Sequence, residues 1–225
     1  RAIADILAEK IPYSLAFGAV SMVLSLILGL LMGMAMAKGK GKWPDALGTG
    51  YVVIVRAVPS LIYLFLLQIA VTGLFHIPMM FSERNPVTWI LPTVSLSLSS
   101  IAWYAIWLRR FMVDEENRDY VKFARSKGMT DWKLMKRHVL RNALVPVVTF
   151  LAQTMAEIVA AGIVVEQVFA IPGLGRLLVA SISNRDYPVV QAIVVILAFW
   201  VVLAGTVADI VNQRIDPRLR LGGAS

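Results

Sequence analysis

The chain contains no cysteine, only two histidines and little charge, and each shortage excludes a class of protein. Without cysteine there is no disulfide and no thiolate-bound metal. His76 and His138 stand far apart in the sequence, which argues against a histidine-based metal or catalytic cluster. Charged residues make up 16% of the 225 residues, whereas a soluble domain carries about a quarter. Together with 58% hydrophobic residues and a mean hydropathy of +0.72, this indicates a membrane protein.

Sequence signatures of enzymes are absent as well. The nearest approach to a phosphate-binding loop is GMAMAKGKG, residues 33–41, which has the wrong spacing and lacks the hydroxyl residue. Neither H-E-x-x-H nor G-x-S-x-G occurs. We therefore expect no catalytic residue, no metal site and no ATP hydrolysis by this polypeptide itself.

Five apolar segments are each long enough to cross a hydrocarbon core about 30 Å thick as a helix. They cover residues 11–37, 50–74, 88–108, 142–168 and 189–211. Five such segments in so short a chain predict a single all-α membrane domain that crosses the bilayer several times, rather than a soluble protein with buried helices.

Lysine and arginine gather in the links that would share one side of the membrane. Sixteen of the 22 lie in residues 38–50, in residues 109–141 and after residue 211; five lie in the other links, and Arg56 lies within the second segment. Because basic residues collect on the cytoplasmic side, this bias predicts a cytoplasmic C-terminus and explains the net charge of +8 without nucleic acid. Arg1 would then lie outside, which suggests a further transmembrane helix before it.

Four charged residues fall within or at the ends of apolar segments: Arg56, Glu157, Glu166 and Asp209. A charge near the bilayer centre is costly unless it faces water or a partner. Counting along the helices places Glu157 deepest, so it either lines a solvated pathway or joins two helices. Arg56 and Asp209 lie nearer the cytoplasmic face and are interpreted as structural, and Glu166 lies nearer the outer face.

Small and hydroxyl residues are concentrated in two segments. Gly29 and Gly33 form a small-x-x-x-small pair that suits close helix packing. The stretch TVSLSLSS holds four serines, at Ser95, Ser97, Ser99 and Ser100. This stripe either packs helices together or lines a pore, in which case Ser97 joins Glu157 on the pathway. Four prolines are placed near segment starts, where a missing N–H costs least: Pro12, Pro59, Pro92 and Pro146.

The link at residues 169–188, FAIPGLGRLLVASISNRDYP, begins with the turn residues Pro172, Gly173 and Gly175. Four apolar residues then follow at helical spacing: Leu174, Leu177, Leu178 and Ile182. We predict a turn and a short helix at the outer mouth of the protein.

The most charged stretch, YVKFARSKGMTDWKLMKRHVLRNALVP (residues 120–146), separates the third and fourth apolar segments. Acidic residues 114–119 suit the first turn of a helix, Gly128 suits its end, and Thr130 or Asp131 suits the start of a second helix. The apolar face of the first helix would hold Tyr120, Phe123 and Ala124, and that of the second Trp132, Met135 and Val139.

This helix–glycine–helix element either lies on anionic lipid or docks into a groove on a soluble partner. Its apolar faces are narrow and are interrupted at Gly128. Lipid binding would not require that interruption, so the pattern favours docking on a partner.

The same stretch resembles the EAA loop of the permease subunits of bacterial ABC importers. That loop has a small-residue pair, a glycine four residues later and a hydrophobic-proline ending, which Ala124, Gly128, Leu144 and Pro146 match. Lys122 departs from the pattern, because many members have Glu there. Four stretches are closest to the oligopeptide, dipeptide and nickel branch: YVKFARSKGM, VEQVFAIPGLGRLLV (165–179), RDYPVVQ (185–191) and DPRLRL (216–221). The resemblance extends from about Ile6 to Leu221.

The resemblance implies the type I permease fold of ABC importers and half of a translocation pathway in the bacterial inner membrane, among its lipids. The implied cargo is oligopeptides or dipeptides, with nickel chelates or glutathione as alternatives. The implied partners are a second homologous permease, an extracytoplasmic binding protein and two ATPase subunits, which would hold the ATP and Mg that this chain does not.

The resemblance also assigns roles to residues. The coupling helix at residues 120–137 would contact an ATPase through Tyr120, Phe123, Ala124, Gly128, Trp132 and Met135. Lys122, Arg125 and Lys127 would steer that contact. Pro172, Gly173 and Gly175 would face the binding protein or shape the gate at the outer mouth.

Two alternatives come from other classes of protein. A self-sufficient secondary transporter or channel would carry protons or ions on Glu157 and Asp209. It would not need a docking element with a central glycine. A membrane-embedded enzyme would need paired catalytic residues, which the sequence lacks.

Overall fold

The computed structural model describes residues 2–76 and 78–215, and within them all side chains except those of residues 149, 152, 153, 156–161, 208 and 212–215. Every regular element in these ranges is helical, which confirms the predicted all-α class. Three helices are long and apolar enough to cross a membrane: α1 (Ile3–Lys38), α4 (Ile90–Glu116, preceded by a 3₁₀ turn at Pro86–Trp89) and α10 (Tyr187–Ile215). A fourth span results if α2 (Trp43–Ala57) and α3 (Ser60–Phe75) are counted together as one bent segment.

The bend between α2 and α3 lies inside the segment expected to form one helix over residues 50–74. The two helices meet at 109°. Val58 is extended, with φ −89° and ψ 126°, because the ring of the following Pro59 disfavours helical geometry there. Pro59 therefore divides this segment, and the prediction of one continuous helix is wrong.

The expected helix over residues 142–168 is also divided. Residues Leu140–Thr149 form α7 and residues Leu151–Val168 form α8, on either side of Phe150. Pro12 lies inside α1 and Pro146 inside α7, so only Pro92, the third residue of α4, and Pro59 lie at helix starts as predicted.

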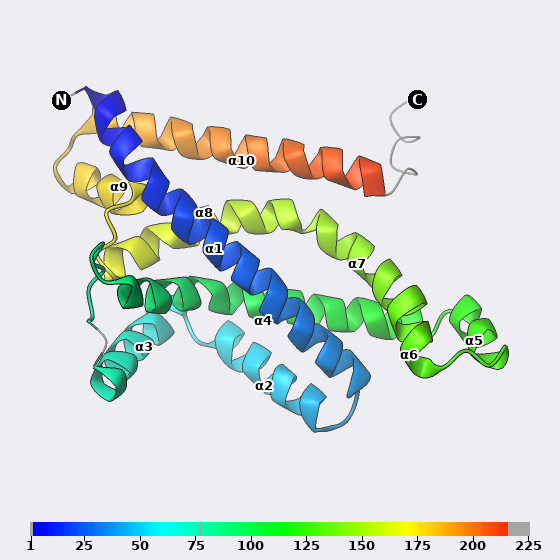
Figure 1. Cartoon of the computed structure of the whole chain (residues 1–225). Coiled ribbons are helices and arrows are strands. Elements are labelled where there is room, and N and C mark those ends of the chain that lie inside the picture. Colours follow the sequence, from blue (N-terminus) through cyan, green and yellow to red (C-terminus); the bar gives the residue numbers. More distant parts are fainter. Residues whose placement is uncertain (1, 77, 216–225) are drawn as a thin grey trace.

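Helices α1 and α4 run side by side through the middle of the molecule (Figure 1). Gly29 and Gly33 lie at their crossing, where a Cβ on Gly29 would come within 2.7 Å of Tyr104 Cβ and one on Gly33 within 2.8 Å of the Ala105 carbonyl oxygen. The small-x-x-x-small pair therefore allows close contact between the helices, as predicted.

Short helices lie at both ends of the long ones (Figure 1). At one end, α5 (Asp119–Ser126) and α6 (Asp131–Leu134) extend beyond α4 and α7. At the opposite end, α9 (Leu174–Ser183) lies beside the starts of α1 and α10. The residues predicted to contact an ATPase and those predicted for the outer mouth thus lie in two regions at opposite ends of the molecule.

Candidate functional site

The α5–α6 element is a short helix, a glycine turn and a second short helix. Gly128 follows α5 with φ +81°, a left-handed conformation that suits glycine, and no atom lies near the position of a Cβ there. Thr130 is the extended residue before α6, although its side chain makes no capping hydrogen bond. The acidic run does not start α5 as predicted: residues 114–116 complete α4, and only Asp119 lies in the first turn of α5.

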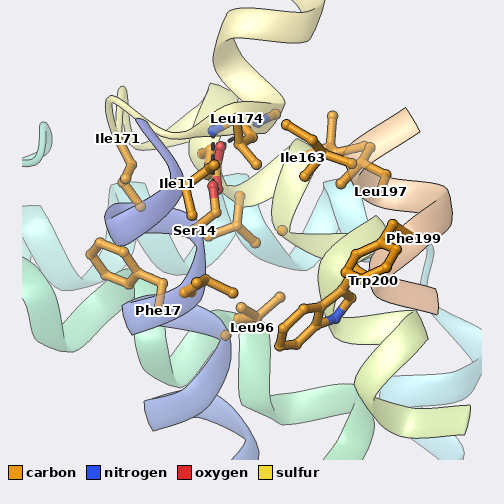
Figure 2. A pocket seen from close by; sticks show the side chains of 17 residues that line it. Ile11, Ser14, Phe17, Leu96, Ile163, Ile171, Leu174, Leu197, Phe199 and Trp200 are labelled. Atoms are coloured by element: carbon orange, nitrogen blue, oxygen red, sulfur yellow. Dashed lines mark hydrogen bonds between the residues drawn. The ribbon is translucent and has the colours of Figure 1, made fainter. Parts of the chain in front are cut away.

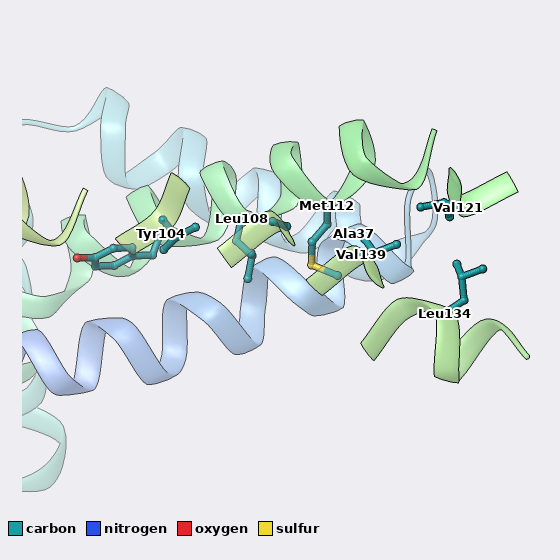
Figure 3. Close-up of a cluster of buried hydrophobic side chains, with 9 residues drawn as sticks. Ala37, Tyr104, Leu108, Met112, Val121, Leu134 and Val139 are labelled. Atoms are coloured by element: carbon teal, nitrogen blue, oxygen red, sulfur yellow. The ribbon is translucent and has the colours of Figure 1, made fainter. Parts of the chain in front are cut away.

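Three fully buried side chains anchor this element to the rest of the protein. Val121, Leu134 and Val139 join Met112 of α4 and Ala37 of α1 in one apolar cluster, and Figure 3 shows them converging from both sides of the turn. Sequence analysis placed Trp132 and Val139 on one face and missed Val121. The face is split because residues 135–139 form a π-helical turn, in which the Leu140 N–H bonds to the carbonyl five residues back and shifts the helical phase.

The opposite side of the element exposes large aromatic side chains. Phe123 is 61% exposed, Trp132 65% and Tyr120 41%. By contrast, Ala124 and Met135 pack against the buried cluster. Between α5 and α6 the surface is hollowed, with a lining of aromatic, small and basic residues that includes Tyr120, Phe123, Ala124, Lys127, Gly128, Met129, Thr130, Lys133 and His138. A partner would therefore meet mainly Phe123, Trp132 and the rim of this hollow.

The three basic residues assigned to steering all interact within the chain. Arg125 pairs with Glu116 at 3.1 Å and with Asp131 at 3.4 Å, so it joins the end of α4 to α5 and α6. Lys122 pairs with Asp119 at 3.1 Å, and Lys127 lies 4.5 Å from the centre of the Phe123 ring. All three remain exposed, so these contacts are weak and leave positive charge at the surface.

Tyr120 is held by its own chain. Its hydroxyl bonds to Glu115, at the end of α4, and accepts a hydrogen bond of 2.6 Å from the Asn142 amide of α7. Partial burial and the bond to Glu115 raise the pKa of Tyr120 above its ordinary value. Tyr120 thus holds α5 against α4 and α7, and it is also partly exposed to a partner.

At the opposite end, a buried carboxylate organises the turn before α9. Glu166 of α8 accepts hydrogen bonds from the Ser14 hydroxyl at 2.6 Å, the Gly175 N–H at 2.7 Å and the Arg176 N–H at 3.2 Å. Ser14 of α1 in turn accepts from the Leu174 N–H at 2.8 Å. The first amides of α9, which have no partner within their own helix, are thereby satisfied.

The glycines of this turn are required by that carboxylate. A Cβ on Gly173 would overlap the Glu166 carboxylate, and one on Gly175 would overlap the α8 backbone at Ile163. Below the turn, an apolar cavity of about 110 Å³ lies between α1, α8 and α10, and Figure 2 shows its lining by Phe17, Leu96, Phe199 and Trp200. The α9 face is built as predicted except at Ile182, which is exposed.

Of the two predicted pathway residues, Ser97 and Glu157, the structure describes only the side chain of Ser97. Ser97 is fully buried in the α1–α4 contact, where it bonds to the Thr93 carbonyl at 2.6 Å and the Ser21 carbonyl at 3.3 Å, so it packs helices and lines no opening. Glu157 belongs to α8, and its side chain lies outside the described part of the structure. Arg56 and Asp209 form no ion pair with another described residue.

Comparison with known proteins identifies the chain. Residues 25–221 match the family described as binding-protein-dependent transport system inner membrane component. The chain belongs to this family. It is a bacterial membrane protein and a permease subunit of an ABC importer, as the EAA-like loop indicated.

Named relatives of the permease transport peptides or glutathione. It is 34% identical to the glutathione transport system permease protein GsiC of Shigella flexneri, over 98% of this chain and 72% of that protein. It is 33% identical to the dipeptide transport system permease protein DppB of Bacillus subtilis, over 96% and 70%. It is 30% identical to the oligopeptide transport system permease protein AmiC of Streptococcus pneumoniae, over 91% of this chain but only 41% of that protein.

The fold matches as well. A chain from the crystal structure of an amino acid ABC transporter superposes with a TM-score of 0.77 and 17% identity, over 94% of each chain. The permease therefore has the fold of ABC importer membrane subunits. Membership of this family also argues against a self-sufficient secondary transporter or channel.

Proposed function

We propose that this permease forms half of the pathway of an ATP-driven peptide importer and couples to a separate ATPase through α5 and α6. The observation that carries the proposal is the pair of exposed aromatic residues, Phe123 and Trp132, on an element anchored by fully buried side chains. An element anchored in this way transmits the motion of whatever grips its exposed face. The inward anchors extend to α1 and α4, so displacement of α5 reaches two of the long helices.

The same proposal gives the molecule its orientation and its partners. The α5–α6 end and the C-terminus lie in the cytoplasm, as the distribution of basic residues indicates. Two ATPase subunits hold ATP and Mg, a second homologous permease completes the pathway, and a binding protein meets the end that carries α9. The chain itself needs no cofactor and catalyses no reaction.

Peptides are the proposed cargo because two of the three relatives are named for dipeptide and oligopeptide transport. Glutathione is the second candidate, favoured by the 34% identity to a glutathione permease. Glutathione is itself built from amino acids, so one pathway of related chemistry serves either cargo. No feature of the described residues favours nickel chelates over these two.

The test is Phe123→Asp in the complex co-expressed with its own partner genes. A buried aromatic contact is worth a few kcal/mol, and an aspartate would also bring a charge into the interface. We expect the tagged variant to co-purify with the second permease but to lose most of the bound ATPase, and uptake of a labelled tripeptide by proteoliposomes to fall at least tenfold.

Phe75→Asp is the matched control, because Phe75 is 69% exposed and lies at the end of α3, whereas Phe123 is on α5. This control should retain the ATPase and keep most of its uptake. Full ATPase retention and normal uptake in Phe123→Asp would refute the coupling role of α5. If the wild-type complex takes up no peptide, the proposal that peptides are its cargo is refuted instead.

A further inference from the structure

A small hollow lined by polar residues and a tryptophan lies beside the bend between α2 and α3, apart from both regions described above. Its lining consists of a cation, an aromatic ring and three hydroxyl groups: Arg56, Trp103, Ser99, Ser100 and Thr154. These residues come from the last turn of α2, the middle of α4 and the start of α8. The fold thus brings the exposed Arg56, which comes from an apolar segment, beside the second half of the serine stripe.

Two tyrosines fix the walls of this hollow. The Tyr51 hydroxyl of α2 donates to the Leu98 carbonyl at 2.8 Å, and the Tyr63 hydroxyl of α3 bonds to the Ser99 hydroxyl at 2.7 Å. Both helices that flank the bend are therefore tied to the same turn of α4. The hollow is formed before any ligand arrives, which reduces the entropic cost of binding.

The polar groups of the hollow are available for an anion. Arg56 has no hydrogen bond or ion pair with another described residue, and Ser100 likewise keeps its hydroxyl donor. Ser99 can donate when Tyr63 donates to it. Thr154 already donates to the Phe150 carbonyl, so it shapes the wall without supplying a proton.

The surroundings make an uncompensated Arg56 costly. Arg56 is itself exposed, and other exposed side chains of α2 and α3, such as Ile54 and Phe65, are apolar, which is typical of surface that meets lipid or another subunit. A guanidinium in such surroundings needs an anion or water. Its planar fork is suited to bind both oxygens of a carboxylate.

We propose that this hollow binds a carboxylate of the cargo, with Arg56 as the cationic partner and Ser99 and Ser100 as hydrogen-bond donors. The inference rests on the proposed function and specifies it, because peptides and glutathione share a free carboxylate. Trp103 supplies an apolar wall that contacts the cargo without selecting one side chain. Arg56 is then a binding residue for a feature common to all these cargoes.

The experiment compares radiolabelled tri-alanine with tri-alanine amide in proteoliposomes that hold the whole complex, in wild-type, Arg56→Gln and Ser100→Ala forms. A charge-assisted contact is worth enough that its loss lowers a rate roughly tenfold or more. We expect Arg56→Gln to lower tri-alanine uptake by that factor while changing amide uptake less than twofold, and Ser100→Ala to show a smaller loss with the same selectivity. Referring each cargo to its own wild-type rate cancels the preference of the binding protein.

Arg110→Gln is the matched control, because it removes an exposed arginine of α4 that lies outside the hollow. It should affect both cargoes equally and weakly. Equal losses for acid and amide in Arg56→Gln would overturn the proposal and indicate that Arg56 pairs with another subunit. A loss seen only in vesicles containing phosphatidylglycerol, and absent in phosphatidylcholine alone, would overturn it in favour of a lipid headgroup. If the wild type takes up neither peptide, the peptide assignment and this site fail together.

Discussion

At the scale of single residues, the Glu166 carboxylate joins three helices at a point where water is excluded. One oxygen receives the Ser14 hydroxyl of α1, and the other receives two amides of α9. Helix N-termini attract negative charge, so a carboxylate suits this place better than a neutral acceptor. Hydrogen bonds to α1 and α8 thus fix the position of the short helix α9.

Removal of this carboxylate should destabilise the protein. In Glu166→Ala the amides of Gly175 and Arg176 lose their acceptor, and the unsatisfied amide of the buried Gly175 costs about 1–3 kcal/mol. We expect a clear drop in the thermal unfolding midpoint of the detergent-purified complex. Glu166→Gln should fall between this variant and the wild type, because its single oxygen still accepts from an amide.

Glu9→Ala serves as the control, since Glu9 is an exposed carboxylate on the same helix as Ser14. Its unfolding midpoint should stay near that of the wild type, because exposed ion pairs contribute little. Equal midpoints for Glu166→Ala and Glu9→Ala would show that the buried carboxylate does not hold α9.

At the scale of elements, the α1–α4 contact is built from small residues rather than from large apolar ones. Two glycines of α1 face the α4 backbone, and serines on both helices exchange hydrogen bonds with main-chain carbonyls, as Ser25 does with Ser97 at 3.3 Å. In a membrane, close packing and such bonds drive helix association, because lipid removes the hydrophobic advantage. The contact should therefore tolerate no added volume.

Gly33→Leu tests that requirement. Its side chain would meet the Ala105 carbonyl and Leu108, and overpacking of a tight contact costs about 1–3 kcal/mol or more. We expect little properly folded protein in detergent, measured as the monodisperse fraction on size-exclusion chromatography. Gly50→Leu is the matched control, because Gly50 also lies in a helix but has no atom near its Cβ position. A similar yield for both variants would contradict the close contact.

Sequence patterns predicted those elements that depend on local spacing. The glycine pair, the Gly128 turn and the helix after Gly173 each follow from residues within one or two turns of each other. The 109° bend at Pro59 was missed because residues 50–74 are apolar on both sides of the proline, and a span predicted from hydropathy alone runs through it. The π-turn at residues 135–139 has no sequence pattern of its own, so the inward and outward faces of the docking element were mixed.

The candidate sites show the same limit for contacts between distant residues. Exposure of Phe123 and Trp132 followed from the docking pattern. The hydrogen bond between Glu166 and Ser14 could not be predicted, because these residues are 152 positions apart and no sequence periodicity links them. Assembly of Arg56 with Ser99 likewise depends on how α2 and α4 pack, and sequence analysis treated these residues separately.

At the scale of the whole molecule, the two candidate functional regions lie at opposite ends of long helices. The α1–α2 turn lies at the end that carries α5 and α6, where Lys38 sits 4.3 Å from the Trp132 ring. Residues at the end of α9 lie at the other extreme (Figure 1). A motor that grips one end can therefore influence a binding protein at the other only through the helices between them.

The proposed orientation can be tested directly, because these 225 residues contain no cysteine. Lys40→Cys places a thiol in the exposed α1–α2 turn, outside the docking surface, and Asn184→Cys places one just after α9. With a membrane-impermeant maleimide, we expect Asn184→Cys to react in intact spheroplasts and Lys40→Cys to react only in inverted membrane vesicles. The unmodified chain is the blank for both. The reverse pattern would turn the protein over in the membrane and place α5 and α6 out of reach of any cytoplasmic ATPase. Labelling of both sites from one side would require an even number of spans between them.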